Sequence, residues 1–136
     1  MAANHIADSS FLVAFLNERD TSHDWAVLQA QHVAPPWKTC EAALSEAFYV
    51  LGVAGSRPLI ELIQIGAVTC AFEFSDHVDD VIRFMAKYRD VPMSFTDACL
   101  VRMSEILSDP VVLTTDSDFR IYRRHGRQVV PCVMPH

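Results

Sequence analysis

Short apolar runs alternate with longer amphipathic stretches along the chain. The most informative run opens the segment 111–119 (VVLTTDSDF), where three aliphatic residues are followed by two threonines and two aspartates. A short apolar run bounded by polar residues predicts a strand buried on both faces, as in a parallel sheet covered by helices. Asp116 and Asp118 then follow the carboxyl end of this strand, the end at which open α/β sheets bind their ligands.

The rest of the chain continues this alternation. Strands are predicted over residues 5–8, 67–74 and 129–133, and helices over residues 20–33, 39–54, 59–65 and 94–107. Two further helices are predicted after Ser9 and Ser10, and after Ser75, because serine often caps the amino terminus of a helix. Pro35 and Pro36 are expected to end the helix over residues 20–33 and to force an extended connection after it. This order of elements predicts an α/β fold.

Two of the predicted helices have a clear inner side. Trp25 and Leu28 are expected to face inward from the helix over residues 20–33. In the helix after residue 75, the expected inner face comprises Val78, Val81, Ile82, Met85 and Tyr88. Its other face carries Asp79, Asp80, Arg83 and Lys87. Charges of both signs at this spacing predict a solvated surface with ion pairs.

Length and composition limit the class of protein. With 136 residues and 51% apolar content, the sequence is expected to form one domain over residues 1–136. The longest apolar run, over residues 47–54, is much shorter than the roughly 20 residues of a membrane span, so no membrane association is expected. The amino terminus lacks the basic region and apolar segment of a secretory signal, which predicts a cytoplasmic location.

Cysteine usage and charge add two expectations. Cys40, Cys70, Cys99 and Cys132 are dispersed and include no CxxC pair, which predicts buried, reduced thiols. The formal charge of −6 argues against unspecific binding of nucleic acid, which depends on lysine and arginine. It leaves open nucleic-acid binding at a metal site.

Asp8 and Asp116 occupy matching positions, because each lies where a predicted buried strand gives way to the next element. Adjacent parallel strands would bring the two carboxylates together although they are 108 residues apart in the sequence. The alternative for Asp8 is a helix cap, although Ser9 and Ser10 could also supply one. For Asp116 the alternative is an Asp-rich turn.

Glu46 interrupts a largely apolar stripe of its predicted helix. The residues at helical spacing around it are Ala42, Ala43, Tyr49, Val50 and Val53. A charge on a buried face costs several kcal/mol unless it is paired or binds a metal. Glu46 is therefore a candidate metal ligand, with a buried ion pair to an arginine as the alternative.

Asp97 is the remaining acidic candidate. It lies three residues after Ser94, which is the spacing of a capping box, so a structural role is one interpretation. A carboxylate in the first turn also projects from the helix amino terminus toward the sheet edge where the other acids would gather. A cluster of like charges is tolerated mainly when a divalent cation neutralises it, and oxygen-only ligands favour Mg²⁺ or Mn²⁺.

Positive charge is concentrated after the last acidic motif. Arg120, Arg123 and Arg124 are followed by His125 and Arg127. Such a cluster suits phosphate or an acidic partner. The alternative is a solvated helix end whose cations interact with the helix dipole.

Taken together, these motifs resemble the PIN-domain family, especially the VapC-type ribonuclease toxins of prokaryotic toxin-antitoxin pairs. The similarity extends over nearly the whole chain. It is carried by IADSSFLVAFLN at the start, LSEAFYVL around Glu46, SFTDACLV around Asp97 and VVLTTDSDFRIY around Asp116.

The resemblance implies a three-layer α/β/α sandwich, Rossmann-like, around a central parallel sheet. It implies a Mg²⁺- or Mn²⁺-dependent endoribonuclease acting on RNA, a homodimer and, for toxins, a small antitoxin partner that blocks the site. The implied catalytic and metal site is Asp8, Glu46, Asp97 and Asp116, with Asp118 as a further ligand or a turn residue, and with hydroxyl positions at Ser10 and Thr115. Arg120, Arg123 and Arg124 are candidate contacts to the substrate.

Two other classes of protein gather acids in a similar way. A haloacid-dehalogenase-like phosphatase needs a second aspartate where this chain has Ser10, and a receiver domain needs a late-strand lysine, whereas Lys38 and Lys87 are misplaced for that role. A PIN fold that only binds RNA or a protein partner remains the alternative function.

Overall fold

A parallel sheet forms the centre of the computed structural model, which describes residues 3–136. Within these residues, five strands pair in the order β3-β2-β1-β4-β7. They are β1 (Asn4–Ala7), β2 (Trp37–Thr39), β3 (Val68–Cys70), β4 (Pro110–Leu113) and β7 (Cys132–Val133). The chain proceeds from β1 outward to β3 and then returns to β4 on the other side of β1. The switch point of the topology therefore lies between β1 and β4.

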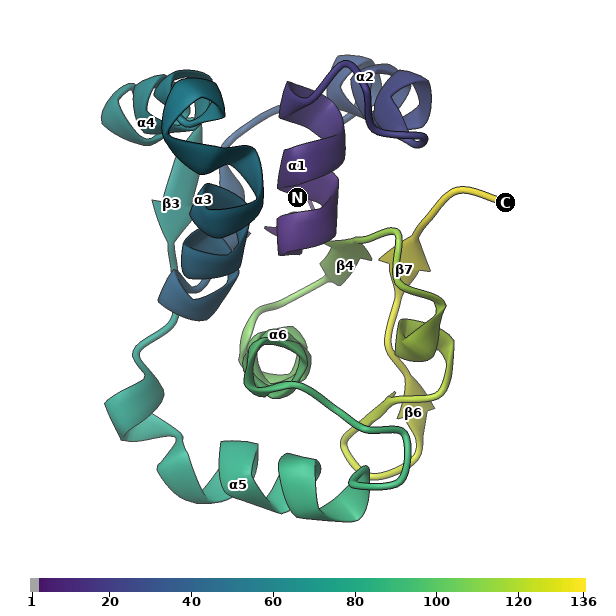
Figure 1. The fold of residues 1–136 in the computed structure, drawn as a ribbon. Helices are drawn as coiled ribbons and strands as arrows, with labels where there is room; N and C mark the ends of the chain where they lie inside the picture. Colours follow the sequence, from purple (N-terminus) through teal and green to yellow (C-terminus); the bar gives the residue numbers. More distant parts are fainter. Residues whose placement is uncertain (1–2) are drawn as a thin grey trace.

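Helices cover both faces of this sheet (Figure 1). The helices of the described residues are α1 (Ser9–Leu16), α2 (His23–His32), α3 (Glu41–Gly55), α4 (Arg57–Gln64), α5 (Val78–Lys87) and α6 (Phe95–Ile106). Those numbered α1 to α4 lie together in the upper part of Figure 1, and α5 and α6 lie below them. The predicted three-layer α/β/α sandwich with a central parallel sheet is confirmed.

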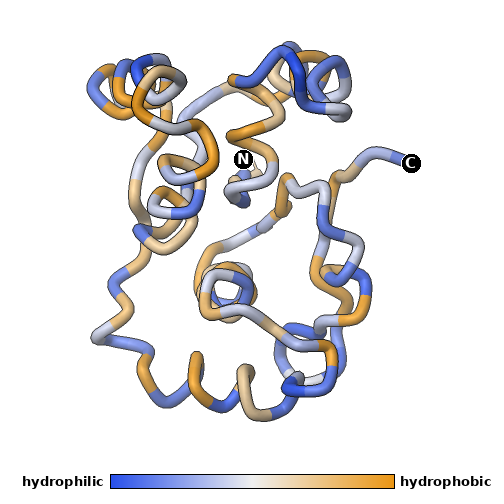
Figure 2. The backbone as a smooth tube through the Cα atoms, in the orientation of Figure 1, coloured by the Kyte–Doolittle hydropathy of each residue, from blue (hydrophilic) through white to orange (hydrophobic). Residues whose placement is uncertain are grey.

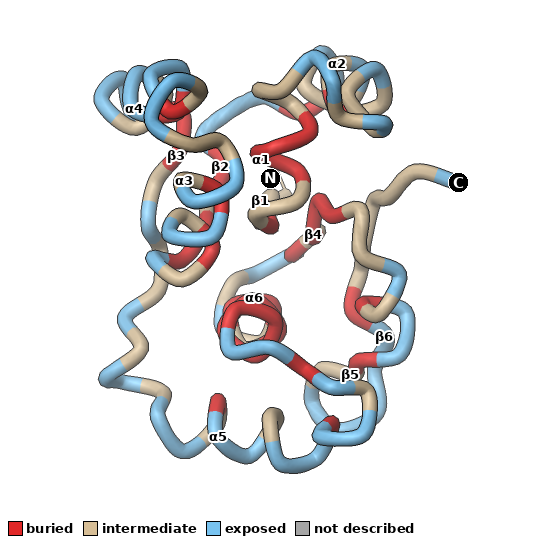
Figure 3. The backbone as a smooth tube through the Cα atoms, in the orientation of Figure 1, coloured by how far each residue is buried: buried red, intermediate tan, exposed pale blue. Residues whose placement is uncertain are grey.

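The two central strands divide their side chains between two cores. Ile6 of β1 and Val112 of β4 pack in the core beneath α5 and α6, whereas Ala7 and Leu113 pack in the core beneath α1 to α4. All four are fully buried. This alternation confirms that the apolar run before Thr114 is a strand covered on both faces, and Figure 3 shows burial concentrated on β4, α1 and α6.

The first helix is apolar on nearly all sides because other elements surround it (Figure 2). Phe11 makes edge-to-face contacts with Trp25 of α2 and Trp37 of β2, with ring centroids 6.0 and 5.2 Å apart. Trp25 therefore faces inward as predicted. Leu28 does not, since it is 49% exposed, and the prediction for that residue is wrong.

Some element boundaries differ from the predictions. The strand β2 was not predicted, because Pro35 and Pro36 precede it and it is only three residues long. Thr39 ends β2, so Cys40 takes the N-cap position of α3 that was expected for Thr39. The predicted strand over residues 129–133 is divided between β7 and β6 (Gln128–Val129), which pairs antiparallel with β5 (Arg123–Arg124).

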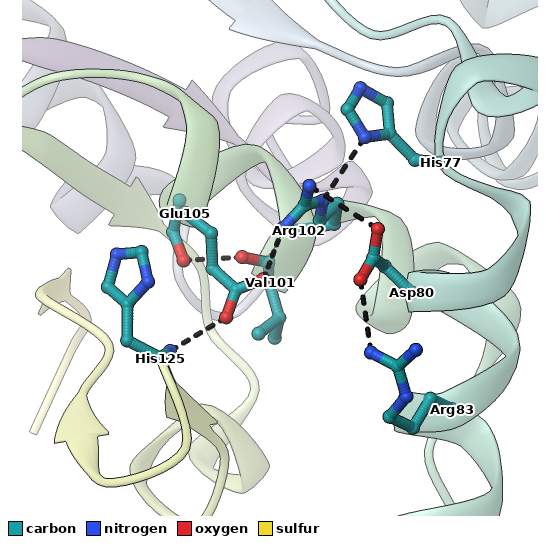
Figure 4. Close-up of polar contacts among 8 residues, drawn as sticks. His77, Asp80, Arg83, Val101, Arg102, Glu105 and His125 are labelled. Atoms are coloured by element: carbon teal, nitrogen blue, oxygen red, sulfur yellow. Dashed lines mark hydrogen bonds and ion pairs between the residues drawn. The ribbon is translucent and has the colours of Figure 1, made fainter.

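The last two helices are tied together by Arg102 (Figure 4). Its guanidinium lies 3.0 Å from Glu105 and 3.3 Å from Asp80 of α5, and its Nε donates to His77 Nδ1 at 3.1 Å. Glu105 in turn accepts the backbone N–H of His125, in the turn between β5 and β6, at 2.7 Å. The network fixes α5 and the β5-β6 hairpin to α6, the helix that carries Asp97.

Candidate active site

Asp8 lies at the carboxyl end of β1, beside the switch point of the sheet. One of its carboxylate oxygens accepts the backbone N–H of Ser9 at 2.7 Å, so Asp8 is the N-cap of α1. The other oxygen accepts the hydroxyls of Ser10 at 3.1 Å and Thr114 at 2.7 Å. Ser9 and Ser10 are the first two residues of α1, so the prediction that they cap it is wrong.

The environment of Asp8 disfavours its charge. The side chain is 4% exposed. Burial raises the pKa of this carboxyl, although the hydrogen bonds from Thr114, Ser10 and Ser9 lower it and the nearby charge of Glu46 raises it further. A bound cation would therefore stabilise the negative charge of an ionised Asp8, which burial has deprived of stabilisation by water.

Thr114 connects two of the candidate carboxylates. It follows β4 directly, and the register that pairs Ala7 with Leu113 places it opposite Asp8. Its hydroxyl donates to Asp8 and also accepts the backbone N–H of Asp116 at 3.0 Å. The sequence analysis named Thr115, not Thr114, as a hydroxyl position of the site. The position of Thr114 directly after the buried apolar run was the signal that could have identified it.

Ser10 and Thr115 are linked through the backbone. The Ser10 hydroxyl accepts the Thr115 N–H at 3.0 Å while it donates to Asp8. Thr115 therefore helps to orient the hydroxyl of Ser10 through its main chain. Its own hydroxyl has no hydrogen-bond partner in the part of the chain that the structure describes.

Asp97 approaches the same sheet edge from α6. Ser94 caps this helix and accepts the backbone N–H of Asp97 at 3.0 Å, as the sequence predicted. The Asp97 carboxylate accepts the hydroxyl of Tyr122 at 2.8 Å. Burial raises the pKa of Asp97 to about 6, the charges of Asp8 and Asp116 contribute to the rise, and the Tyr122 hydrogen bond opposes it. No sequence motif predicted the contact between Asp97 and Tyr122.

Asp116 and Asp118 belong to one short turn. Asp116 is the N-cap of the 3-10 turn η2 (Ser117–Arg120), and its Oδ1 accepts the backbone N–H of Asp118 at 2.9 Å. The turn role considered for this segment is therefore present. Burial raises the pKa of the Tyr122 hydroxyl, and the charges of Asp97, Asp118 and Asp116 raise it further.

Glu46 requires a correction. Its side chain is exposed, and so are Tyr49, Val50 and Val53 at the positions that were expected to form a buried stripe. The argument that burial makes this charge costly is therefore wrong, because this face of α3 points to solvent. Glu46 nevertheless lies at the site, since its Oε1 accepts the hydroxyl of Ser9 at 2.8 Å.

The three arginines are placed differently. Arg120 is exposed on η2, two residues after Asp118. Arg123 donates to the carbonyls of Arg120, Ile121 and Tyr122 at 2.7 to 3.2 Å, which accounts for its position structurally. Arg124 has a buried Nε without a hydrogen-bond partner among the described residues.

The donor set can be compared with what a divalent cation requires. Among residues 3–136, no three His, Cys, Asp or Glu side chains are arranged, as they stand, to hold one ion. The available ligands are nevertheless carboxylates and hydroxyls, which Mg²⁺ and Mn²⁺ prefer. The charges of Asp8 and Asp116 both act on Asp97, and no lysine or arginine in the described part of the chain forms an ion pair with these three acids. In its chemistry, this set fits a divalent cation.

A comparison with protein-family models identifies the fold family. The model described as PIN domain matches residues 6–124, a range that includes all the acidic candidates and the arginines. The chain belongs to the PIN domain family. PIN domains are generally nucleases that bind nucleic acid, and PIN nucleases generally use divalent metals. A search of curated proteins finds no match to this PIN domain.

One further finding concerns the helices of this PIN domain. In the part of the chain that the structure describes, none is long and apolar enough to cross a membrane.

Proposed function

We propose that this PIN domain is an endoribonuclease that hydrolyses RNA phosphodiester bonds with Mg²⁺ or Mn²⁺. The observation that carries the proposal is the buried carboxylate of Asp8, which lies at the same sheet edge as Asp97 and Asp116 and forms no ion pair with a cationic side chain among residues 3–136. Such an arrangement is destabilising for the folded chain alone. A divalent cation bound between the three carboxylates offsets their repulsion and makes the arrangement favourable.

Asp8, Asp97 and Asp116 would hold the cation, directly or through water, with Asp118 as either a fourth ligand or a turn residue. When bound, a divalent cation lowers the pKa of water and offsets the charge that develops on a phosphoryl group in hydrolysis. Glu46 lies on the solvent side of Asp8 and would orient the attacking water or bind the metal.

The neighbouring hydroxyls supply the positioning that this chemistry needs. Thr114 and Ser10 hold one oxygen of Asp8, and Thr114 also holds the backbone of Asp116. Thr115 orients Ser10 through its backbone. Arg120, on the turn that follows Asp116, is the one of the three arginines that is exposed, and it would contact an RNA phosphate.

Cleavage of single-stranded RNA by the purified protein tests the proposal. We expect cleavage with Mg²⁺ or Mn²⁺, none with a chelator, and none by Asp8→Asn, whose circular dichroism should match that of the parent. Asp90→Asn, which changes an exposed aspartate outside the site, should cleave normally. Undiminished cleavage by the Asp8→Asn variant would exclude the assigned site.

The proposal extends to a role as the cytoplasmic toxin of a type II toxin-antitoxin pair, acting as a homodimer. An apolar surface beside the site supports a protein partner: Tyr49 and Val50 are exposed and line a cavity of about 530 Å³ with Ser9 and Glu46. Co-expression with any small open reading frame adjacent to the coding sequence tests this role. A toxin should lose its RNase activity in the complex, whereas unchanged activity counts against an antitoxin.

A PIN module that only binds RNA or a protein is the second candidate. It is favoured by the absence, among residues 3–136, of three side chains already arranged around one ion position. Calorimetric titration distinguishes the two functions. Binding of Mn²⁺ or Mg²⁺ at or below millimolar concentration supports the nuclease, and no binding in that range supports the pure binding module.

A further inference from the structure

Positive charge gathers where the carboxyl end of α5 meets the β5-β6 hairpin. The hydroxyl of Tyr88 accepts the backbone N–H of Arg123 at 3.0 Å, and the ring centroids of Tyr88 and Tyr122 are 5.2 Å apart, so the two segments lie side by side (Figure 1). Six of the 11 lysines and arginines of the chain lie on these segments and on the turn η2. This basic surface comprises Lys87, Arg89, Arg120, Arg123, Arg124 and Arg127.

The cations of the basic surface are not neutralised within the protein. None of the six forms an ion pair with an acidic side chain of residues 3–136. Arg123 is held by backbone carbonyls, and the buried Nε of Arg124 has no hydrogen-bond partner among the described residues, so neither charge is offset by a carboxylate. The acids nearest in sequence, Asp90 and Asp118, also leave these cations unpaired. Such a surface attracts phosphates, although the formal charge of the whole chain is −6.

The other side of the carboxylate site carries negative charge. In the strand order β3-β2-β1-β4-β7, the turn η2 and the hairpin follow β4, whereas α3 follows β2 on the opposite side of β1. Figure 3 shows β2 and β3 on one side of β1 and the hairpin on the other. Glu41 of α3 and Glu73, which follows β3, are exposed and border one cavity of about 200 Å³. Lys38 of β2 donates to Asn4 at the amino end of β1, away from this edge. The charge therefore changes sign across the carboxyl edge of the sheet.

We propose that the basic surface binds phosphates of the RNA substrate on one side of the scissile bond only. This inference rests on the proposed function. Tyr122 connects the two surfaces, because its hydroxyl donates to Asp97 at 2.8 Å and the chain continues directly into Arg123. A strand whose scissile phosphate lies at the acids therefore passes onto the hairpin, where its next phosphates meet cations. Toward α3 the strand instead meets Glu41 and Glu73, which repel phosphate.

RNA binding in the presence of a chelator tests the basic surface without metal and without cleavage. The probe is a fluorescently labelled single-stranded RNA, and its affinity is measured by anisotropy at several salt concentrations. The logarithm of the association constant falls with the logarithm of the salt concentration, with a slope of about −0.7 for each phosphate that is neutralised. Replacing Lys87, Arg89 and Arg127 together with alanine removes three exposed cations. We expect the slope of this triple variant to be smaller in magnitude by about 2.

A second triple variant controls for net charge. Replacing Arg19, Arg57 and Arg83 with alanine also removes three exposed cations, but none belongs to the basic surface. Its slope should equal that of the parent. Equal slopes for the two triple variants would overturn the proposal. Displacement of the RNA by polyglutamate at equal charge concentration would also overturn it, and would assign the surface to an acidic protein partner.

Cleavage of shortened substrates tests the one-sided contact. An RNA with a single cleavage position is trimmed from its 5′ end or from its 3′ end. We expect trimming at one end to lower kcat/KM and trimming at the other end to leave it unchanged, and the variant of the basic surface should lose this difference. Equal losses from both ends would overturn the one-sided contact. A parent protein that cleaves no RNA with Mg²⁺ or Mn²⁺ would overturn the proposed function, whereas the binding measured with chelator would still decide whether the basic surface holds RNA.

Discussion

Thr114 Oγ1 lies 2.7 Å from Asp8 Oδ2, and this contact joins the ends of the two central strands. The same hydroxyl accepts the backbone N–H of Asp116 at 3.0 Å. One buried side chain therefore sets the orientation of Asp8 and the position of Asp116 together. Mutation of residues that hold metal ligands in this way typically lowers metal affinity or activity by roughly 10–100-fold.

Replacing the Thr114 hydroxyl should weaken the site. In Thr114→Val the side chain keeps its size, but Asp8 loses its shortest hydroxyl donor, so we expect roughly tenfold weaker Mn²⁺ binding by calorimetry and a loss of about 1–3 kcal/mol in the free energy of unfolding. Thr114→Ser keeps the hydroxyl and should remain close to the parent. Equal affinity of Thr114→Val and the parent would show that this contact does not position Asp8.

Tyr122 should matter through its hydroxyl. Tyr122→Phe keeps the buried ring but removes the donor that lies 2.8 Å from Asp97 Oδ2. We expect Mn²⁺ affinity to fall by about tenfold, with the free energy of unfolding changed by only about 1 kcal/mol. Tyr49→Phe, which removes a hydroxyl at an 88% exposed position, is the matched control and should change neither quantity. If both variants bind Mn²⁺ alike, the Tyr122 contact has no role in the site.

Asp97 should make the stability of the metal-free protein depend on pH. Its pKa in the folded protein, about 6, is above the ordinary value of 3.8, so folding favours the protonated form. This contribution is fully present below about pH 3.8 and is lost as the pH rises through about 6. Relative to Asp97→Asn, we expect the parent to lose on the order of 1–2 kcal/mol between these pH values in urea unfolding with a chelator. A parallel pH dependence of the two proteins would contradict the raised pKa.

Arg102 should be more important for stability than Arg83, although both contact Asp80. Arg102 is 23% exposed and also binds Glu105 and His77, whereas Arg83 is 72% exposed. Arg102→Met should cost about 3 kcal/mol, because it leaves Glu105 buried without its cation. Arg83→Met should cost less than about 1 kcal/mol. Thermal unfolding of the two variants provides the measurement, and equal losses would refute the assigned role of the network.

The sequence was sufficient for much of the fold because the deciding signals are local. The buried run before Thr114 has no polar interruption, and the spacing of Ser94 and Asp97 identifies a helix start. The convergence of Asp8 and Asp116 followed from the rule that parallel strands share a carboxyl edge. By contrast, β2 was not predicted, because three residues are too few to show the alternation of a strand and because Pro35 and Pro36 directly precede them.

The buried faces of helices were predicted less well, because the sequence does not show whether another element packs against a given apolar residue. Val78 and Ile82 were expected on the inner face of α5 but are largely exposed, whereas Val81 and Tyr88 are buried. The same uncertainty produced the wrong argument for Glu46, since Tyr49, Val50 and Val53 on α3 face solvent. Glu46 lies at the site because it accepts a hydrogen bond from Ser9, and the sequence of α3 does not indicate this contact.

The sequence by itself thus determined the alternation of strands and helices apart from β2 and the β5-β6 hairpin, the sheet class, and the acids at the ends of β1 and β4, because each depends on residues that are close in the chain. Only the tertiary structure decided that Thr114 binds Asp8, that Tyr122 binds Asp97, and that Cys40 and Cys99 line one cavity. These pairs are far apart in the sequence. Their contacts depend on strand register and on how α3 and α6 pack, which short-range patterns of polarity do not encode.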